Sequence, residues 1–252
     1  MHALETNYWW FVGRRAIIGR LLAVTLRRVG SKHPHVLDLG CGTGANLPML
    51  CEAAGPDGRV VGLDYSPLAL QFARAQSHQP NLSLTQGDGL NLPIGNGWAD
   101  CVTMLDVLEH LSDDTRALQE VNRVLRPGGA LVLSVPAYQH LWSAHDEALH
   151  HFRRYEFAGL NRLLVANGFE VWRLSFAMSM MPPLAWGWRR FVLPRQPKRP
   201  KNATRHSEGA ILPNVPPALN KLLIKYVELE GRIITRRRLR FGTSLVAVAF
   251  KK

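Results

Sequence analysis

Residues 36–47 read VLDLGCGTGANL, and this stretch decides how the rest of the chain is interpreted. Apolar residues on both sides of Asp38 predict a buried strand, and glycines on alternate positions follow it. Glycine permits a sharp turn and a close approach between backbone and ligand. The stretch therefore predicts a strand, a tight turn and a helix, with a ligand site at the turn.

The alternation of strand and helix continues on both sides of this turn. Strands are predicted over His35–Leu39, Arg59–Leu63, Asn81–Gln86, Ala99–Leu105, Ala130–Val135, Phe169–Phe176 and Ser244–Phe250. Helices are predicted over 45–54, 67–76, 113–125 and 157–167. Such spacing indicates parallel βαβ units. We expect an α/β fold, a Rossmann-like doubly wound sheet of seven mostly parallel strands with N-terminal helices and a helical insertion before the last strand.

The length of 252 residues suits one α/β domain with additions. We expect an N-terminal helical cap over 1–34, a core formed by 35–176 and 241–252, and a basic, apolar insertion over 177–240. Within the insertion, 194–209 is rich in proline and basic residues and has no periodicity, which predicts a loop.

The net charge of +12 is concentrated in one part of the chain. Residues 189–240 hold 14 Lys and Arg against 3 Asp and Glu, whereas residues 1–188 hold 15 and 16. A segment of this kind favours an anionic partner, such as a phospholipid surface, a phosphorylated substrate or RNA.

Four acidic residues stand at or just after the ends of four successive predicted strands: Asp38, Asp64, Asp88 and Asp106. The carboxyl ends of parallel strands meet at one edge of the sheet, where ligands bind. The sequence GCGTGA also fits a loose dinucleotide motif, but carboxylates repel a diphosphate. They suit a nucleoside with a positively charged tail, with Asp64 on the ribose hydroxyls and Asp88 on the adenine amino group.

The chain resembles the class I S-adenosylmethionine-dependent methyltransferases over residues 36–136. The motifs that carry the resemblance are VLDLGCGTG, VVGLDYSP, GDGLNLPI, DVLEHL and RVLRPGGALVLSVP, in this order. The family implies S-adenosylmethionine as the cofactor, held by Asp38, Gly40, Gly42, Gly44, Asp64, Tyr65, Asp88, Gly89, Leu105, Asp106 and His110. An NAD oxidoreductase and a non-catalytic binding module remain more distant alternatives.

Two outer motifs resemble a bacterial branch of this family that is associated with cell-envelope and saccharide assembly. They are YWWFVGRRAII at Tyr8–Ile18 and HDEALHHFRRY at His145–Tyr155. The first offers Arg14 to the cofactor carboxylate, with aromatic residues closing the pocket. The alternative is an amphipathic helix whose aromatic residues belong to the core.

The second motif supplies the candidates for chemistry on the methyl acceptor. His151 is the first candidate for a base or a substrate contact, and His145 is the second. Arg153, Arg154 and Tyr155 are predicted to bind the acceptor, the alternative being packing and ion pairs at a helix start. The histidine spacing is not that of a metal site, so no metal is expected.

The insertion combines tryptophan, apolar residues and arginine, as interfacial elements do. Over 219–234, one helical face carries Leu219, Leu222, Leu223, Tyr226, Val227 and Ile234. We expect an element that lies on a membrane or a lid over an apolar substrate, the alternative being packing on its own domain or a partner subunit.

These features leave two main functional hypotheses. The first is transfer of a methyl group to an oxygen atom of a small acceptor, or of one linked to a lipid or saccharide, at a membrane surface. The second is RNA methylation, with the basic insertion on phosphates. The segment at residues 1–10 has no signal-peptide pattern and no apolar run is long enough to span a bilayer, so a cytoplasmic protein, peripheral at the inner membrane face, is expected. Cys41, Cys51 and Cys101 are expected to be reduced core thiols.

Overall fold

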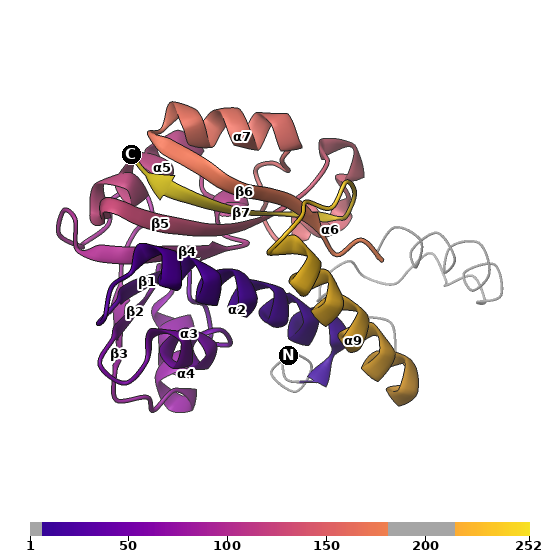
Figure 1. Cartoon of the computed structure of the whole chain (residues 1–252), viewed down its shortest axis with the longest axis horizontal. Helices are drawn as coiled ribbons and strands as arrows, with labels where there is room; N and C mark the ends of the chain where they lie inside the picture. Colours follow the sequence, from indigo (N-terminus) through magenta and orange to yellow (C-terminus); the bar gives the residue numbers. More distant parts are fainter. Residues whose placement is uncertain (1–6, 181–214) are drawn as a thin grey trace, which may run out of the picture.

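The computed structural model describes residues 7–180 and 215–252. Its centre is a seven-stranded sheet with the order β3-β2-β1-β4-β5-β7-β6 (Figure 1). The strands are β1 (His35–Leu39), β2 (Arg59–Asp64), β3 (Leu82–Gln86), β4 (Ala99–Leu105), β5 (Leu125–Pro136), β6 (Phe169–Ala177) and β7 (Ser244–Lys251). The first five are parallel, and β7 runs antiparallel to both β5 and β6. The predicted fold class is confirmed.

The strand order places a topological switch at the centre of the sheet. From β1 the chain moves outward through β2 to β3 and then crosses back to β4, which pairs with the other edge of β1. Loops at the carboxyl ends of β1 and β4 therefore diverge in opposite directions. Doubly wound sheets bind their ligands in the crevice that this divergence opens.

Helices cover both faces of the sheet. They are α2 (Trp9–Val29), α3 (Leu47–Ala54), α4 (Pro67–Gln76), α5 (Asp114–Val124), α6 (Ala144–Ala148), α7 (Phe157–Ala166) and α9 (Pro217–Ile234), with short 3-10 turns η1 (Leu108–His110) and η2 (Gln139–Leu141). Buried side chains of α2, α3, α4 and α9 form one core cluster with the sheet. Those of α5 and α7 form a second on the opposite face. None of the helices within residues 7–180 and 215–252 is long and apolar enough to cross a membrane.

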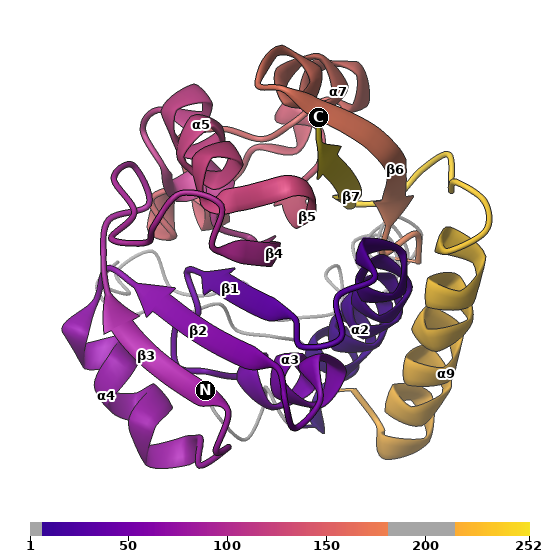
Figure 2. The ribbon, with the colours of Figure 1, turned by 60° about the vertical axis from the view of Figure 1, so that its left-hand side comes forward.

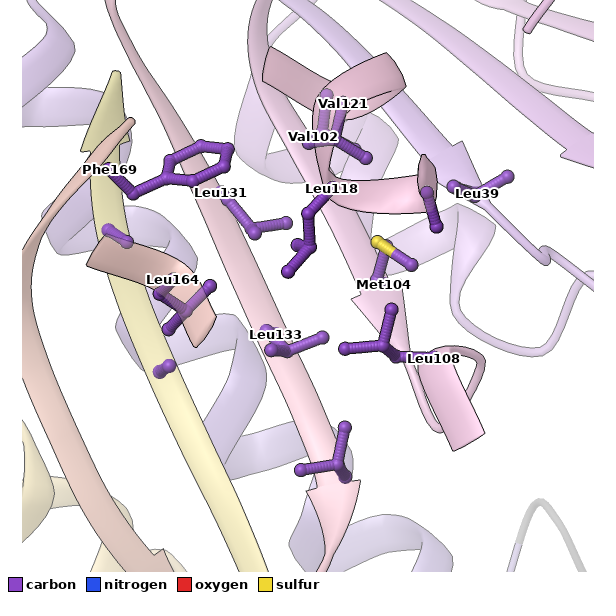
Figure 3. Close-up of a cluster of buried hydrophobic side chains, with 14 of the residues drawn as sticks. Leu39, Val102, Met104, Leu108, Leu118, Val121, Leu131, Leu133, Leu164 and Phe169 are labelled. Atoms are coloured by element: carbon purple, nitrogen blue, oxygen red, sulfur yellow. The ribbon is translucent and has the colours of Figure 1, made fainter. Parts of the chain in front are cut away.

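Alternating strand residues supply the two clusters. In Figure 3, Val102 and Met104 of β4 and Leu131 and Leu133 of β5 belong to one cluster with Leu118 of α5. Their neighbours along the chain, such as Cys101 and Val132, belong to the other cluster. Strands buried on both faces are near-continuously apolar, which is why these runs could be recognised in the sequence.

Two predicted boundaries differ from the structure by two residues or more, each for a local reason. Helix α3 begins at Leu47 rather than at residue 45, because Gly44 has φ +90° and the turn continues through it. Strand β5 begins at Leu125, five residues before the predicted start, because Leu125 already pairs with Ala99. A β-bulge and Gly128, with φ +73°, then fit the RPGG sequence into the strand.

The basic insertion contributes α9, which lies beside α2 on one face of the sheet (Figure 2). The two helices approach closely at glycines: a Cβ at Gly13 would lie 2.7 Å from Val227 Cβ, and one at Gly231 would lie 3.2 Å from Ile17 Cα. Packing on the protein's own domain, one of the alternatives for the insertion, thus holds for this helix. Residues 181–214, including the predicted loop over 194–209, lie outside the described residues.

The apolar face expected on α9 is only partly buried. Leu223, Val227 and Ile234 are buried against the domain. Leu219, Leu222 and Tyr226 are exposed, as are Leu229 and Ile233. The helix is therefore apolar over a wider arc than its contact with α2 can cover.

All three cysteines, which lie in the described part of the chain, are buried and free. Burial raises the pKa of Cys51 to about 11 and raises the pKa values of Cys41 and Cys101 further. They are inert core thiols, as expected from the sequence.

Candidate active site

A cleft of about 570 Å³ lies at the carboxyl ends of β1 to β4, at the topological switch. We call it the strand-end cleft. It is lined by residues at or after the ends of these strands and by Phe152 of the loop after β5. The lining residues are Leu39, Gly40, Leu63, Asp64, Tyr65, Gly87, Asp88, Gly89, Leu90, Asp106, Val107, His110, Leu111, Ser112 and Phe152. Of the predicted cofactor contacts, Gly40, Asp64, Tyr65, Asp88, Gly89, Asp106 and His110 line it. Arg14, Asp38, Gly42, Gly44 and Leu105 are not among its lining residues.

The glycine turn after β1 is held against β2. The backbone N–H groups of Gly40 and Cys41 both donate to the carbonyl oxygen of Leu63, at 2.7 and 3.0 Å. Gly40 has φ +74°, and a Cβ there would collide with Val107, which also lines the cleft. Only glycine fits this position, so the residue type follows from both the backbone angle and the close contact.

Asp64, the last residue of β2, connects the glycine turn to the start of α4. Its Oδ2 accepts a hydrogen bond of 2.8 Å from the N–H of Gly42, and its Oδ1 accepts one of 2.9 Å from the N–H of Ser66. One carboxylate thus orients two loops that border the strand-end cleft. Gly42 itself has open space around its Cα, since a Cβ there would meet no atom within 4 Å.

Asp38 lies beneath the cleft rather than on its surface. It is 1% exposed, and its Oδ1 accepts a 2.6 Å hydrogen bond from the Thr103 hydroxyl of β4. Its Oδ2 is buried without a hydrogen-bond partner among the described residues. Burial raises the pKa of Asp38 to about 7, and the negative charge of Asp64 adds to the shift. Three of the four predicted acids therefore line the cleft, and the fourth supports it from below.

Asp106 is paired within the protein. Its Oδ2 lies 2.6 Å from a guanidinium nitrogen of Arg14, and its Oδ1 accepts a 2.9 Å hydrogen bond from the Ser134 hydroxyl. Arg14 also donates to Ser134 and lies over the ring of Trp10. Asp106 has φ +55°, an uncommon angle for a non-glycine residue that marks a constrained position at the cleft. Arg14 thus secures the N-terminal helix to the carboxyl end of β4.

The remaining cofactor candidates differ in exposure. Tyr65 is 76% exposed at the rim, whereas Leu105 is buried. Asp88 accepts a hydrogen bond from the N–H of Leu90 through its own Oδ1, at 2.9 Å, which closes the turn after β3. Gly89 adjoins it in the cleft lining, and Gly44 ends the glycine turn with φ +90°.

The loop after β5 carries a buried histidine–carboxylate pair. His151 Nδ1 lies 2.9 Å from Oδ1 of Asp146, which is fully buried. Arg154 donates to both oxygens of the same carboxylate, at 2.7 and 2.8 Å. Burial alone would raise the pKa of Asp146, but the hydrogen bonds from Arg154 and His151 lower it well below its usual range. Asp146 is therefore an ionised group that orients both neighbours.

Three of the predicted acceptor residues are held by other side chains. Arg154 forms the fork on Asp146 just described. Arg153 forms an ion pair with Asp114 at 3.1 Å, and the Tyr155 hydroxyl donates to the same carboxylate at 3.1 Å. These contacts match the packing and ion-pair alternative. Ala144–Ala148 forms α6, but the side chain of His145 is not among those described.

Sequence reasoning gave no role in the site to Asp146, Glu109, Ser134 or Thr103. Glu109 lies in the DVLEHL motif and Asp146 beside the candidate histidines, so proximity was a usable signal for both. Ser134 and Thr103 are strand residues whose partners, Asp106 and Asp38, lie on neighbouring strands. Cross-strand register decides these contacts, and register is not readable from one strand alone.

Comparisons with known proteins agree with this geometry. Residues 37–133 match the family model described as a methyltransferase domain. A probable S-adenosylmethionine-dependent methyltransferase of Mycolicibacterium smegmatis is 33% identical over 169 residues, which is 66% of this chain and 61% of that protein. A demethylmenaquinone methyltransferase of Lactococcus lactis is 39% identical over 114 residues, which is 44% of this chain and 45% of that protein. The chain thus spans less than two thirds of the length of either relative.

Solved structures show the same fold. A methyltransferase of Haloferax volcanii, solved with its Trm112 activator, aligns with TM-score 0.61 and 22% identity over 99% of this chain and 91% of that chain. An S-adenosylmethionine-dependent methyltransferase of Mesorhizobium loti aligns with TM-score 0.58 and 17% identity over 92% and 96%. Together with the motifs and the sheet order, these matches show that the domain around residues 37–133 belongs to the class I S-adenosylmethionine-dependent methyltransferase family.

Proposed function

We propose that this chain transfers a methyl group from S-adenosylmethionine to an oxygen atom of a small or lipid- or saccharide-linked acceptor. The observation that carries the proposal is the strand-end cleft, in which a glycine turn and the carboxylates Asp64, Asp88 and Asp106 meet at the switch between β1 and β4. A cleft with this lining suits a nucleoside that carries positive charge and disfavours a diphosphate.

The residues present fit the cofactor. The open space at Gly42 admits a ligand against the backbone, and Asp64 offers carboxylate oxygens at the end of β2. In the proposed assignment Asp64 holds the ribose hydroxyls and Asp88 the adenine amino group. Gly44, Tyr65, Gly89, Leu105 and His110 complete the surroundings. Arg14 acts through Asp106, which it orients, instead of standing free for the cofactor carboxylate.

Methyl transfer mainly requires the protein to position the cofactor and the acceptor. S-adenosylmethionine, when bound, supplies a methyl group already activated on a positively charged sulfur. The protein then contributes proximity and orientation, which account for a large share of the rate in such reactions. For an oxygen acceptor a proton must also be removed, and His151 is the candidate, with Asp146 fixing its ring through Nδ1. Phe152, next in the chain, lines the cleft and brings this loop to it.

Two observations support an apolar or membrane-bound acceptor. The exposed side chains Leu222 and Leu229 of α9 stand on a helix that also carries Lys221 and Lys225. Apolar and basic residues on one surface helix favour a bilayer interface. A relative named for a demethylmenaquinone acceptor supports a small-molecule substrate. The same proposal includes attachment of the chain to the inner face of a membrane. It also includes membership of the bacterial branch of the family that is associated with cell-envelope and saccharide assembly.

The test has two stages. Calorimetry with S-adenosylmethionine should show one site per chain, and absence of binding would end the proposal. A screen with S-adenosylmethionine labelled on its methyl group should then transfer label to lipid or saccharide extracts. Transfer of label to RNA instead would favour the competing hypothesis of RNA methylation. Sedimentation with vesicles that contain anionic lipid should carry the protein down, and less so in high salt.

A further inference from the structure

The turn after β4 and the loop after β5 bring together three side chains that can bind a metal ion. Glu109 and His110 belong to η1, and His151 follows α6, 41 positions along the chain. One potential ligand atom from each lies within 4.8 Å of the others. The two imidazole rings are 4.6 Å apart and nearly perpendicular, at 80°. We call these three residues the Glu–His–His cluster.

Glu109 is the unusual member of the cluster. Its side chain is 1% exposed, and neither carboxylate oxygen has a hydrogen-bond partner among the described residues. The nearby arginines are engaged elsewhere, since Arg14 pairs with Asp106 and Arg154 with Asp146. Burying a carboxylate without a partner costs several kcal/mol, and a bound cation or a proton would offset that cost. The position of Glu109 therefore calls for a positively charged partner.

His151 is oriented to provide that partner with a ligand. The ionised Asp146 accepts a hydrogen bond from Nδ1–H, which leaves Nε2 as the ring nitrogen available to a ligand. Histidines that bind metals characteristically donate their other ring nitrogen to a carboxylate in this way. Asp146 is itself fixed by the two hydrogen bonds from Arg154. The ring of His151 is therefore held in place before any ion arrives.

We propose that Glu109, His110 and His151 bind a divalent transition-metal cation at the edge of the strand-end cleft. Two imidazoles and one carboxylate are a donor set suited to Zn²⁺, Fe²⁺ or Mn²⁺ and leave coordination positions open. Ligand atoms around such an ion lie about 3–4 Å apart, so the observed cluster is slightly open. His110 is exposed and lines the cleft, so the open side of the site faces the cleft.

This inference deepens and rests on the proposed function, because it identifies how the acceptor is held. A divalent cation held there would bind acceptor oxygen atoms and lower the pKa of a hydroxyl group among them, so that its proton passes to solvent water. His151 would then serve as a ligand, in place of the base role given to it above. The acceptor would accordingly carry oxygen donors, such as neighbouring hydroxyl or carbonyl groups, next to the methylated position.

The test measures cation binding by the full chain after treatment with a chelator. Calorimetry with Mn²⁺, and separately with Zn²⁺, should show one site per chain for at least one of them. Glu109→Gln and His151→Ala should each weaken that binding at least tenfold. His140→Ala is the matched control, a histidine of the same loop outside the cluster, and should leave it unchanged. The proposal is overturned if neither ion binds the wild-type chain with Kd below about 1 mM.

Thermal melting separates a ligand role from a structural one. The ion that binds should raise the Tm of the wild-type chain and leave that of Glu109→Gln unchanged. Without the ion, Glu109→Gln should melt no lower than wild type, because the Glu109 carboxyl makes no hydrogen bond that the substitution would remove. A lower Tm without the ion would instead assign Glu109 a structural role. S-adenosylmethionine binding is measured in parallel: its loss would refute the proposed function, whereas loss of cation binding alone would refute only the inference made here.

Discussion

At the scale of single residues, the acids at the strand ends have different tasks although the sequence presents them alike. Asp64 joins two loops by accepting from backbone N–H groups, and Asp106 holds Arg14 of the N-terminal helix. Asp38 is buried beneath them with one oxygen on Thr103. Neighbouring groups and burial decide the role of a carboxylate, and both are set by the fold.

Replacing Asp64 with alanine should weaken S-adenosylmethionine binding at least tenfold, about 1.4 kcal/mol, as expected for lost hydrogen bonds to a charged group. The variant also frees the Gly42 N–H, which loosens the glycine turn. Calorimetry measures the affinity. Asp57→Ala, an exposed acid just before the opposite end of β2, is the control and should bind as wild type does. Equal affinities for the two variants would remove Asp64 from the cofactor site.

Asp38 should make stability depend on pH. In the unfolded chain the Asp38 carboxyl has its ordinary pKa of 3.8, whereas in the folded chain its pKa is raised to about 7. Between these values the folded state binds more protons, so its free energy of unfolding falls as pH rises, by at most about 1.4 kcal/mol per pH unit. Asp38→Asn keeps an acceptor for Thr103 and should remove this part of the slope. Urea denaturation of both proteins from acid to neutral pH tests it, and parallel profiles would contradict the assignment.

At the scale of elements, the contact between α2 and α9 fixes how the insertion sits on the domain. Gly13 faces Val227 and Gly231 faces Ile17, so each helix presents a glycine where the other approaches. Asn220 of α9 also accepts a 2.8 Å hydrogen bond from the N–H of Trp9 at the start of α2. The helix that carries Arg14 is therefore supported by α9, which connects the insertion to the cleft.

Gly13→Ala should destabilise the protein. Alanine favours a helix by about 1 kcal/mol over glycine, but the added Cβ would lie 2.7 Å from Val227, and overpacking costs about 1–3 kcal/mol. A net loss of up to about 2 kcal/mol is expected from urea denaturation. The control is Gly19→Ala in the same helix, where the nearest neighbour is the flexible Met49 side chain at 3.1 Å, and it should be neutral or stabilising. Stabilisation by both variants would show that the helices are not in tight contact.

At the scale of the whole molecule, the strand-end cleft is assembled from segments far apart in the chain. Loops after β1, β2, β3 and β4 contribute lining residues, and Phe152 comes from the loop after β5. A ligand that binds only this assembled form stabilises the entire fold by mass action. Cofactor binding should therefore be visible as a change in global stability.

S-adenosylmethionine at about 100 times its Kd should stabilise the chain by about 2.7 kcal/mol. For a domain of this size that corresponds to a rise in Tm of about 5–11 °C, measured by calorimetry or fluorescence. Asp64→Ala at the same cofactor concentration should show a clearly smaller rise. An unchanged Tm of the wild-type chain at saturating cofactor would mean that the cofactor does not bind the folded chain in preference to the unfolded one. That result would contradict binding in the strand-end cleft.

The elements of the core were predictable because their signals are local. His35–Leu39, Pro67–Gln76 and Ala99–Leu105 begin and end where the sequence analysis places them. The α9 region was harder: Leu222 and Val227 are equally apolar in sequence, yet one is exposed and the other buried against Gly13. Which side of an apolar helix is buried depends on the neighbouring helix. The sequence of the helix alone does not reveal which side that is.

The amino-acid sequence by itself determined the α/β class, the glycine turn and the acids at the strand ends, because hydrophobic periodicity and glycine angles act over a few residues. Tertiary structure alone decided that Arg14 meets Asp106, that Asp146 orients His151 and that Glu109 lies unpartnered beside two histidines. These contacts join residues from different loops and helices. Their partners are selected by the order and register of the sheet, which only the folded chain establishes.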